Sequence, residues 1–405
     1  MPIMDPKPIS TTAKLMLTLA FLLGLAAVAI PRAQAQTFKV VYSFTGGSDG
    51  GNPLDGFITD AEGNLYATTN VGGASGNGTV FEVSKSGEET VLYSFAGGTD
   101  GANPEGGLIR DKAGNLYGTT TAGGGVEDSG TIFKVTPTGT EEVLYSFPAG
   151  NNGATPEAGL TMDALGNLYG TTTAGGANGN GTVFRLTAPK SGSKWLETVL
   201  YSFGTGADGA IPVGGVAFDK TGHLYGMTSA GGAYGYGTIF QLTRSASGWT
   251  ETILQNFQDG DDGAVPYGGL IADKLGNFYG AATEGGAGGG GTIFELTPAN
   301  GSWTFNVIYS NPGWGISGSF RNVALDASGN LYGTTHCDGA YNSGTVYKLT
   351  PASGSWTYTS LYVFQGGTDG LYSFSNPALE PGHVYGTTKQ GGANGNGVVW
   401  EITLN

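Results

Sequence analysis

Three acidic residues stand at positions from which carboxylates could do acid–base chemistry. Asp55, Glu105 and Glu157 each follow, by one or two residues, the proline of a loop that reads [DN]-G-x-x-P. Two carboxyl groups on either side of a bond can act as general acid and general base on a glycoside or lyase substrate. Nothing in the sequence sets their separation. They therefore support one hypothesis, a hydrolase or lyase acting on a polysaccharide or lactone.

A second set of residues suits ligand binding. Aromatic side chains interrupt glycine-rich loops in the second half of the chain, and one later loop carries His-Cys-Asp where others read T-A-G-G. Aromatic rings stack on the apolar faces of sugars while nearby polar groups bond the hydroxyls. The alternative is that these rings pack against their own turns. The predicted ligand-binding residues are Tyr234, Tyr236, Tyr267, Trp314, His336, Asp338 and Tyr341.

One loop is a candidate cation site. Asp259, Asp261 and Asp262 lie in an Asp-Gly loop, which can offer carboxylate and carbonyl oxygens to calcium. Calcium wants about six to eight oxygens, and the full EF-hand spacing is absent, so the alternative is a β-turn closed by a proline. We expect no other cofactor.

The consecutive residues His336, Cys337 and Asp338 invite a metal or nucleophile hypothesis. Three neighbours in sequence do not easily converge on one centre. A structural metal site needs about four ligands, and a cysteine nucleophile needs a separate base. We therefore assign this triplet to ligand binding only.

The elements that position these residues come from a sevenfold repeat. A G-N-L-Y-G-T-T unit recurs with small variations, and G-T-[IV]-F follows each copy about a dozen residues later. Its tyrosines are spaced by 51, 52, 56, 54, 53 and 53 residues. A period near fifty, built from short apolar runs and glycine turns, is typical of propeller blades. The anchor residues are Tyr66, Tyr117, Tyr169, Tyr225, Tyr279, Tyr332 and Tyr385.

Each repeat predicts four antiparallel strands, a to d from the axis outward. In the second repeat these are 107–111, 116–120, 130–135 and 141–147. The d strands are apolar on both faces, as expected where each sheet packs between two neighbours. Glycines within strand b, such as Gly118, are expected to allow close approach of adjacent blades.

The chain ends predict how the ring closes. Residues 37–44 match a d strand, and residues 397–403 match a c strand. We therefore predict an all-β, seven-bladed β-propeller of four-stranded antiparallel blades, spanning residues 36–405 and closed by an N-terminal strand that completes the last blade. Such closure removes exposed sheet edges.

The predicted fold places the loops on two opposite faces. The d-to-a and b-to-c loops share one face, the upper face, which carries the ligand-binding candidates. The a-to-b turns lie on the other face, where an acidic residue bonds its own backbone and is structural. His223 and His383 belong to these turns. The turn acids are Asp60, Asp111, Asp163, Asp219, Asp273, Asp326 and Glu380.

The first 35 residues predict export. Lys7 and Lys14 precede an apolar run over 15–30, and Ala33-Gln-Ala35 is typical of a signal-peptide cleavage site. The alternative is a retained N-terminal anchor. A net charge of −15 argues against nucleic acid and anionic membrane surfaces, and one cysteine excludes an intramolecular disulfide. We expect a periplasmic or extracellular monomer without a membrane span in the mature chain.

The repeat resembles the GloVer-type tandem-repeat family of exported bacterial proteins, through its seven G-[NH]-[LFV]-Y units and the G-[TV]-[IV]-[FYW] that follows each. The segment 111–117 also looks like the D-x-x-G-N-[LV]-Y core of NHL and lactonase-like propellers. These resemblances imply an exported propeller and no particular activity. The favoured hypothesis is a non-enzymatic binding or cell-surface module for an extracellular glycan or protein. A purely structural surface protein is the third hypothesis.

Overall fold

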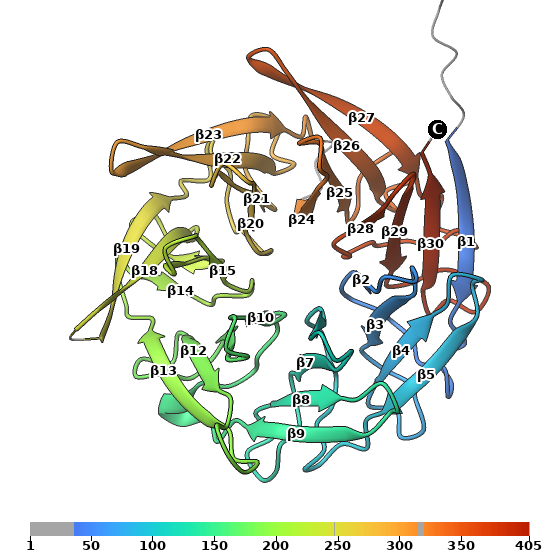
Figure 1. The fold of residues 1–405 in the computed structure, drawn as a ribbon. Coiled ribbons are helices and arrows are strands. Elements are labelled where there is room, and N and C mark those ends of the chain that lie inside the picture. Colours follow the sequence, from blue (N-terminus) through green and yellow to red (C-terminus); the bar gives the residue numbers. More distant parts are fainter. Residues whose placement is uncertain (1–35, 247, 314–319, 405) are drawn as a thin grey trace, which may run out of the picture. The chain divides into compact units, whose positions relative to one another are not determined.

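Seven four-stranded antiparallel sheets surround a central channel, which confirms the predicted β-propeller (Figure 1). The computed structural model describes residues 36–246, 248–313 and 320–404, within which Thr37–Leu404 form one compact unit. The predicted signal peptide, residues 1–35, lies outside the described residues. Within them, no helix is long and apolar enough to span a membrane.

The strands of each blade run in order from the channel outward. Blade 1 consists of β2 (Ile58–Thr59), β3 (Leu65–Thr69), β4 (Thr79–Val83) and β5 (Glu89–Ser94). Blade 2 consists of β6 (Ile109–Arg110), β7 (Leu116–Thr120), β8 (Thr131–Val135) and β9 (Glu141–Ser146). Blades 3 and 4 are β10 (Thr161–Met162), β11 (Leu168–Thr172), β12 (Thr182–Thr187), β13 (Leu196–Ser202), and β15 (Ala217–Phe218), β16 (Leu224–Thr228), β18 (Thr238–Ser245), β19 (Gly248–Asn256).

The remaining blades follow the same plan. Blades 5 and 6 are β20 (Ile271–Ala272), β21 (Phe278–Ala282), β22 (Thr292–Ala299), β23 (Ser302–Ser310), and β24 (Phe320–Leu325), β25 (Leu331–Thr335), β26 (Thr345–Ala352), β27 (Ser355–Val363). Blade 7 is β28 (Ala378–Glu380), β29 (His383–Thr388), β30 (Val398–Thr403), β1 (Thr37–Ser43). The short pair β14 (Gly209–Ala210) and β17 (Ala230–Gly231) and the 3-10 turn η1 (Gly150–Asn152) lie in loops.

Blade 7 is closed by the two ends of the compact unit. Strand β1 pairs with β30 from Thr37↔Thr403 to Ser43↔Val398, with one irregularity between Val40 and Tyr42. Figure 1 shows the blue β1 lying beside the red β30. The predicted closure is therefore confirmed.

The strand-b glycines have a different role from the predicted one. Gly118 lies opposite Phe133 of the next strand in the same blade, and a Cβ on Gly118 would meet the Cζ of that ring at 2.6 Å. Gly170 meets Phe184 in the same way, at 2.7 Å. These glycines accommodate an aromatic ring of their own blade, so the prediction that they admit the neighbouring blade is wrong.

The [DN]-G-x-x-P loops tie each blade to the preceding one. Asp100 accepts hydrogen bonds from the backbone N–H of Ala96 (2.5 Å) and the hydroxyl of Tyr93 (2.7 Å), which holds the loop in a turn. Asn103, just before the proline, has φ of 57° and donates its N–H to Asn77 O of blade 1 at 2.9 Å. Asn52 makes the equivalent bond from blade 1 to Asn396 of blade 7. These bonds set the direction in which the chain enters the channel.

The six a-to-b turns that begin with aspartate are structural, as predicted, and the same role for Glu380 stays a prediction. The carboxylate of Asp111 accepts hydrogen bonds from the backbone N–H groups of Ala113 and Asn115, both at 2.9 Å, and from the hydroxyl of Tyr117 at 3.1 Å. These bonds hold the pKa of Asp111 below its usual range despite partial burial. The turn histidine His223 contacts Asp219 through Nδ1, at 3.0 Å.

Four glutamates lie between adjacent blades near the outer edge, namely Glu89, Glu141, Glu197 and Glu251. At the junction of blades 3 and 4, the hydroxyl of Tyr201 lies 3.1 Å from Asp208 and 3.2 Å from Glu251. Among the described residues, Oε1 of each glutamate is buried without a hydrogen-bond partner. Burial, followed by the neighbouring Asp208 carboxylate, raises the pKa of Glu251 to about 8.

Candidate functional site in the central channel

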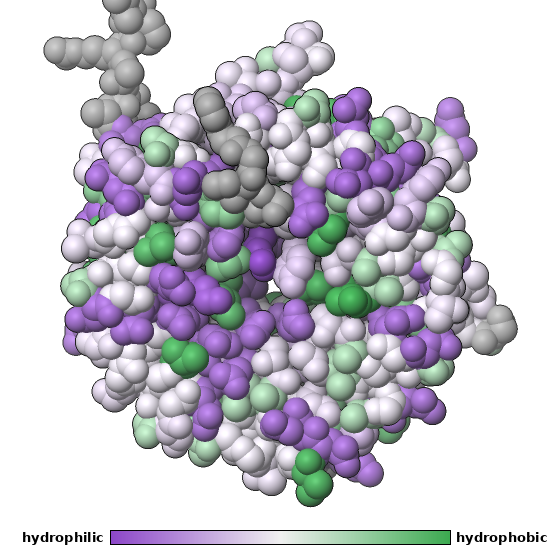
Figure 2. All heavy atoms as spheres, turned by 180° about the vertical axis from the view of Figure 1, so that it is seen from behind, coloured by the Kyte–Doolittle hydropathy of each residue, from purple (hydrophilic) through white to green (hydrophobic). Residues whose placement is uncertain are grey.

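A cavity of about 510 Å³ occupies the middle of the ring and is lined by residues from all seven blades. Figure 2 shows this hollow at the centre of one face, with hydrophilic side chains gathered around it. Glycine occupies the same inner position in five blades: Gly56, Gly107, Gly159, Gly215 and Gly269. The volume is typical of small-molecule sites.

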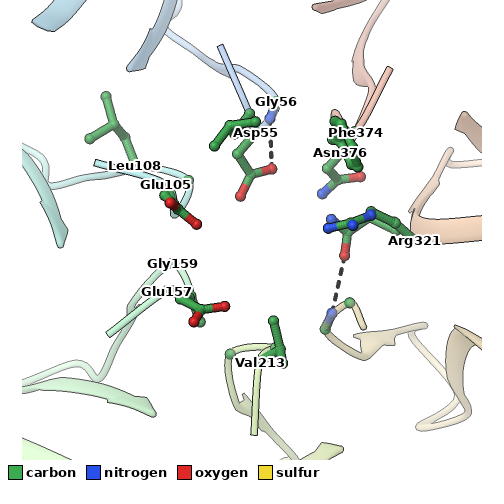
Figure 3. A pocket seen from close by; sticks show the side chains of 18 of the residues that line it. Asp55, Gly56, Glu105, Leu108, Glu157, Gly159, Val213, Arg321, Phe374 and Asn376 are labelled. Atoms are coloured by element: carbon green, nitrogen blue, oxygen red, sulfur yellow. Dashed lines mark hydrogen bonds between the residues drawn. The ribbon is translucent and has the colours of Figure 1, made fainter. Parts of the chain in front are cut away.

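The three predicted carboxylates meet in this channel. Asp55, Glu105 and Glu157 come from blades 1 to 3 and point into the cavity (Figure 3). We call them the acidic wall. Asp55 accepts the N–H of Gly56 at 2.6 Å, and Glu157 accepts the hydroxyl of Thr173 at 3.1 Å.

Burial raises the pKa of each carboxyl group in the acidic wall. At Glu105 the nearby carboxylate of Glu157 raises the pKa further, while the cations Lys389 and Arg321 lower it. The amide of Asn70 also donates to Glu105, at 3.4 Å. The acidic wall therefore presents carboxyl oxygens that can accept hydrogen bonds from a bound molecule.

The opposite side of the channel is cationic. Arg321 extends from β24 towards two aromatic rings. Its guanidinium carbon lies 4.3 Å from the ring centroid of Tyr267 (blade 5) and 4.1 Å from that of Phe374 (blade 7). The Nζ of Lys389 lies 5.6 Å from the centroid of Phe374. Such contacts favour a cation over an aromatic face. Burial lowers the pKa of Arg321 and the acidic wall opposes that effect, so the guanidinium keeps its charge.

A strand irregularity positions Arg321. The pairing of β24 with β25 shifts between Phe320 and Val323, and the Oδ1 of Asn322 accepts the N–H of Gly269 from blade 5 at 3.1 Å. β-bulges commonly re-aim a side chain in this way. Sequence analysis missed Arg321, Lys389 and Phe374. The available signal was Arg-Asn in blade 6, where blades 4 and 5 carry Gly-Gly.

Two of the predicted ligand-binding residues belong to the channel region. Tyr267 lines the cavity beneath Arg321. The ring of His336 packs on Tyr372 and Phe374, with centroids 4.6 and 4.3 Å apart. Burial, with Arg321 and Lys389 nearby, lowers the pKa of His336 to about 4.

The other predicted binding residues lie elsewhere. Tyr234, Tyr236 and Tyr341 are on b-to-c loops with 56%, 38% and 57% of their surfaces exposed. Asp338 accepts hydrogen bonds from Thr335 and, at 3.2 Å, from Asn311, so it supports its own loop. Trp314 lies outside the described residues. Ligand binding by these residues stays a prediction.

The acidic loop of blade 5 uses one of its carboxylates locally. Asp262 accepts hydrogen bonds from Gln255 Nε2 at 3.0 Å and from the N–H of Gln258. Asp259 has φ of 58°, and its N–H donates to Gly263 O at 3.2 Å. In the described part of the chain, no three His, Cys, Asp or Glu residues are grouped to hold a metal ion. Calcium at Asp259, Asp261 and Asp262 stays a prediction.

The sequence profile of the Gloeobacter/Verrucomicrobia repeat matches residues 30–217 and 164–400, nearly the whole chain. The chain belongs to this repeat family. The predicted resemblance is thereby confirmed. No curated protein sequence matches this Gloeobacter/Verrucomicrobia repeat protein.

Solved structures share the fold of this repeat protein at low identity. A candidate 6-phosphogluconolactonase from Bacteroides uniformis aligns with a TM-score of 0.55 and 14% identity, over 83% of this chain and 90% of that one. The extracellular domain of a candidate one-component system from B. thetaiotaomicron aligns with a TM-score of 0.56 and 11% identity. The alignment covers 90% of this chain and 40% of that one. PorZ, a surface component of the type-IX secretion system of Porphyromonas gingivalis, aligns with a TM-score of 0.51 and 14% identity. The alignment covers 87% of this chain and 46% of that one. At these identities the likeness establishes the fold alone.

Proposed function

We propose that this repeat protein is an exported binding protein that holds a hydroxyl-rich small molecule, a saccharide, in its central channel. The observation that carries the proposal is the convergence of charged side chains from blades 1, 2, 3, 6 and 7 on one cavity of about 510 Å³. Carboxyl, amide and cationic groups together both donate and accept hydrogen bonds, as sugar hydroxyls require.

The export part of the proposal has two supports. Residues 1–35 have the composition of a signal peptide. Two proteins that share the fold are described as an extracellular domain and a bacterial surface component. Periplasm and cell exterior both fit, and a structural surface role without a ligand is the alternative.

The acidic wall favours a second candidate function. Burial raises the pKa of both Glu105 and Glu157, and the Glu157 carboxylate raises that of Glu105 further. Two carboxyl groups in one cavity can serve as acid and base in glycoside or lactone cleavage. Under this alternative, Glu105→Gln and Glu157→Gln abolish product formation without changing the melting temperature.

Thermal melts of residues 36–405 with a panel of oligosaccharides, sugar lactones and calcium test the proposal. A ligand at a hundred times its dissociation constant stabilises a protein by about 2.7 kcal/mol. We expect a saccharide to raise the melting temperature, and Glu105→Gln to reduce that shift. Tyr234→Ala, on an exposed loop, is the control and should leave the shift intact.

The same melts identify the alternatives. Loss of the shift in Tyr234→Ala but not in Glu105→Gln would move the ligand site to the exposed loops. A shift with calcium alone would favour the Asp259–Asp262 loop. Absence of any shift would favour a structural role, and chromatography of each mixture would reveal turnover.

A further inference from the structure

Arg321 has donors that no described protein group uses. Its guanidinium is flanked by the rings of Tyr267 and Phe374, at 4.3 and 4.1 Å. Among residues 36–246, 248–313 and 320–404, no hydrogen bond or ion pair joins its N–H groups to an acceptor. A guanidinium with covered faces can still bind through its edge, where its N–H groups point.

The acidic wall does not take these donors. Asp55 bonds the N–H of Gly56, Glu105 the amide of Asn70, and Glu157 the hydroxyl of Thr173. Figure 3 shows Arg321 reaching into the channel from the side opposite Glu105 and Glu157, with open space between. Arg321 therefore acts on the acidic wall at a distance, and its edge faces the cavity.

The group that matches this edge is a carboxylate. A guanidinium binds a carboxylate through two parallel N–H···O bonds, which are stronger than bonds to neutral oxygens. Lys389 adds a second positive charge on the same side of the cavity. The cavity is far larger than a carboxylate alone, and its opposite wall offers hydrogen-bond partners for hydroxyl groups. Arg321 and the acidic wall stand on opposite sides of the cavity, so a carboxylate at Arg321 lies away from those carboxyls (Figure 3).

We propose that the channel selects acidic sugars: the carboxylate of a uronic acid unit binds the edge of Arg321, beside Lys389, and its hydroxyl groups face Asp55, Glu105 and Glu157. This inference rests on the proposed function, because it assigns a ligand class to the same cavity. Tyr267 and Phe374 have a positioning role, since their ring centroids lie 4.3 and 4.1 Å from the guanidinium carbon.

Isothermal titration with matched ligands tests this selection. The probes are glucuronic and galacturonic acid oligosaccharides, their methyl esters, which keep the ring but lose the charge, and the neutral glucose and galactose oligosaccharides. We expect the wild-type protein to bind one of the acids roughly ten- to a hundredfold more tightly than its ester. The ester comparison needs no variant, so it stands even if a substitution prevents folding.

Two variants locate the effect. Arg321→Gln should bring acid and ester to equal affinity, and Arg321→Lys should keep only part of the preference, because an ammonium cannot form the bidentate pair. The matched control is Arg110→Gln. Arg110 also lies over an aromatic ring, that of Tyr66 at 5.8 Å, but it is exposed and outside the cavity. This control should leave the preference unchanged.

The outcomes separate the inference from the proposed function. Equal affinity for acid, ester and neutral sugar would overturn the selection for acidic sugars and leave saccharide binding standing. A preference for the acid that survives in Arg321→Gln would also overturn it, since the carboxylate would then bind elsewhere. Failure of every saccharide to bind would overturn both proposals.

Discussion

The buried glutamates between blades predict that this propeller loses stability as the pH rises towards 8. Glu251 has an ordinary pKa of 4.5, raised to about 8 in the folded protein, so the folded state holds its proton more tightly than the unfolded state. Stability from this group is therefore fully present below pH 4.5 and is lost as the pH rises through about 8. Glu89 and Glu141, with pKa values raised to about 7, add the same trend.

The size of the effect follows from the pKa shift and the exposure. Each pKa unit corresponds to about 1.4 kcal/mol. Glu251 keeps part of its surface in solvent, where charges are screened. We therefore reduce the free energy that corresponds to its full pKa shift to about 2 kcal/mol. The turn carboxylates do not cancel the trend. Their pKa values are lowered, so they weaken the fold only below the usual aspartate range.

Urea unfolding, followed by tryptophan fluorescence at pH 5, 6.5 and 8, measures this effect. Wild type should lose free energy of unfolding from pH 5 to 8, and Glu251→Gln should lose about 2 kcal/mol less, because a neutral amide occupies the junction. Glu142→Gln is the control, since Glu142 is exposed on β9 and paired with Lys134. Equal pH dependence in wild type and Glu251→Gln would refute the assignment of a proton to this junction.

Three further predictions concern single side chains. Gly118→Ala should lower the free energy of unfolding by about 1–3 kcal/mol, because its Cβ would meet the ring of Phe133 at 2.6 Å. The control Gly367→Ala should be tolerated, since no atom lies within 4 Å of the added Cβ. Equal denaturation midpoints of the two variants would contradict this prediction. Tyr117→Phe should cost about 1 kcal/mol in the same assay, through the lost hydrogen bond to Asp111. NMR titration should find His336 neutral down to about pH 4, and an ordinary histidine pKa would show that it is not buried against Phe374.

The repeat explains why most of the fold could be predicted. The Gly-Asn-Leu-Tyr unit, with small variations, specifies a turn and strand b in every blade, and the turn bonds made by Asp111 recur at Asp60 and Asp163. The carboxylates of the acidic wall could also be predicted, because a proline marks where the chain enters the channel. Their partners could not. Blade 6 has no D-G-x-x-P loop and its inner strand contains an irregularity, so the direction of Arg321 depends on backbone geometry that the repeat does not encode.

The sequence also does not show which contacts the strand glycines and the loop tyrosines make. Gly118 has to be glycine because a ring of its own blade lies where a side chain would be. The repeat spacing alone cannot tell this contact from a contact with the next blade. Likewise, Tyr267 and Tyr234 both lie in loops that the sequence analysis assigned to the upper face, yet the first lines the channel and the second is exposed. Which side of a loop a ring occupies depends on packing between blades.

The pairing of β1 with β30 also has a consequence for the order in which the protein can be completed. The partner of Thr37 is Thr403, so the first strand to leave a ribosome or an export channel waits for the last one before its edge is covered. Chains are made at about 5–20 residues per second, which leaves that edge open for tens of seconds. Blades 1 to 6 can assemble from neighbouring segments during this time, but the ring cannot become a single cooperative unit. We therefore expect chains interrupted before Val398 to lack the last junction and to aggregate through β1.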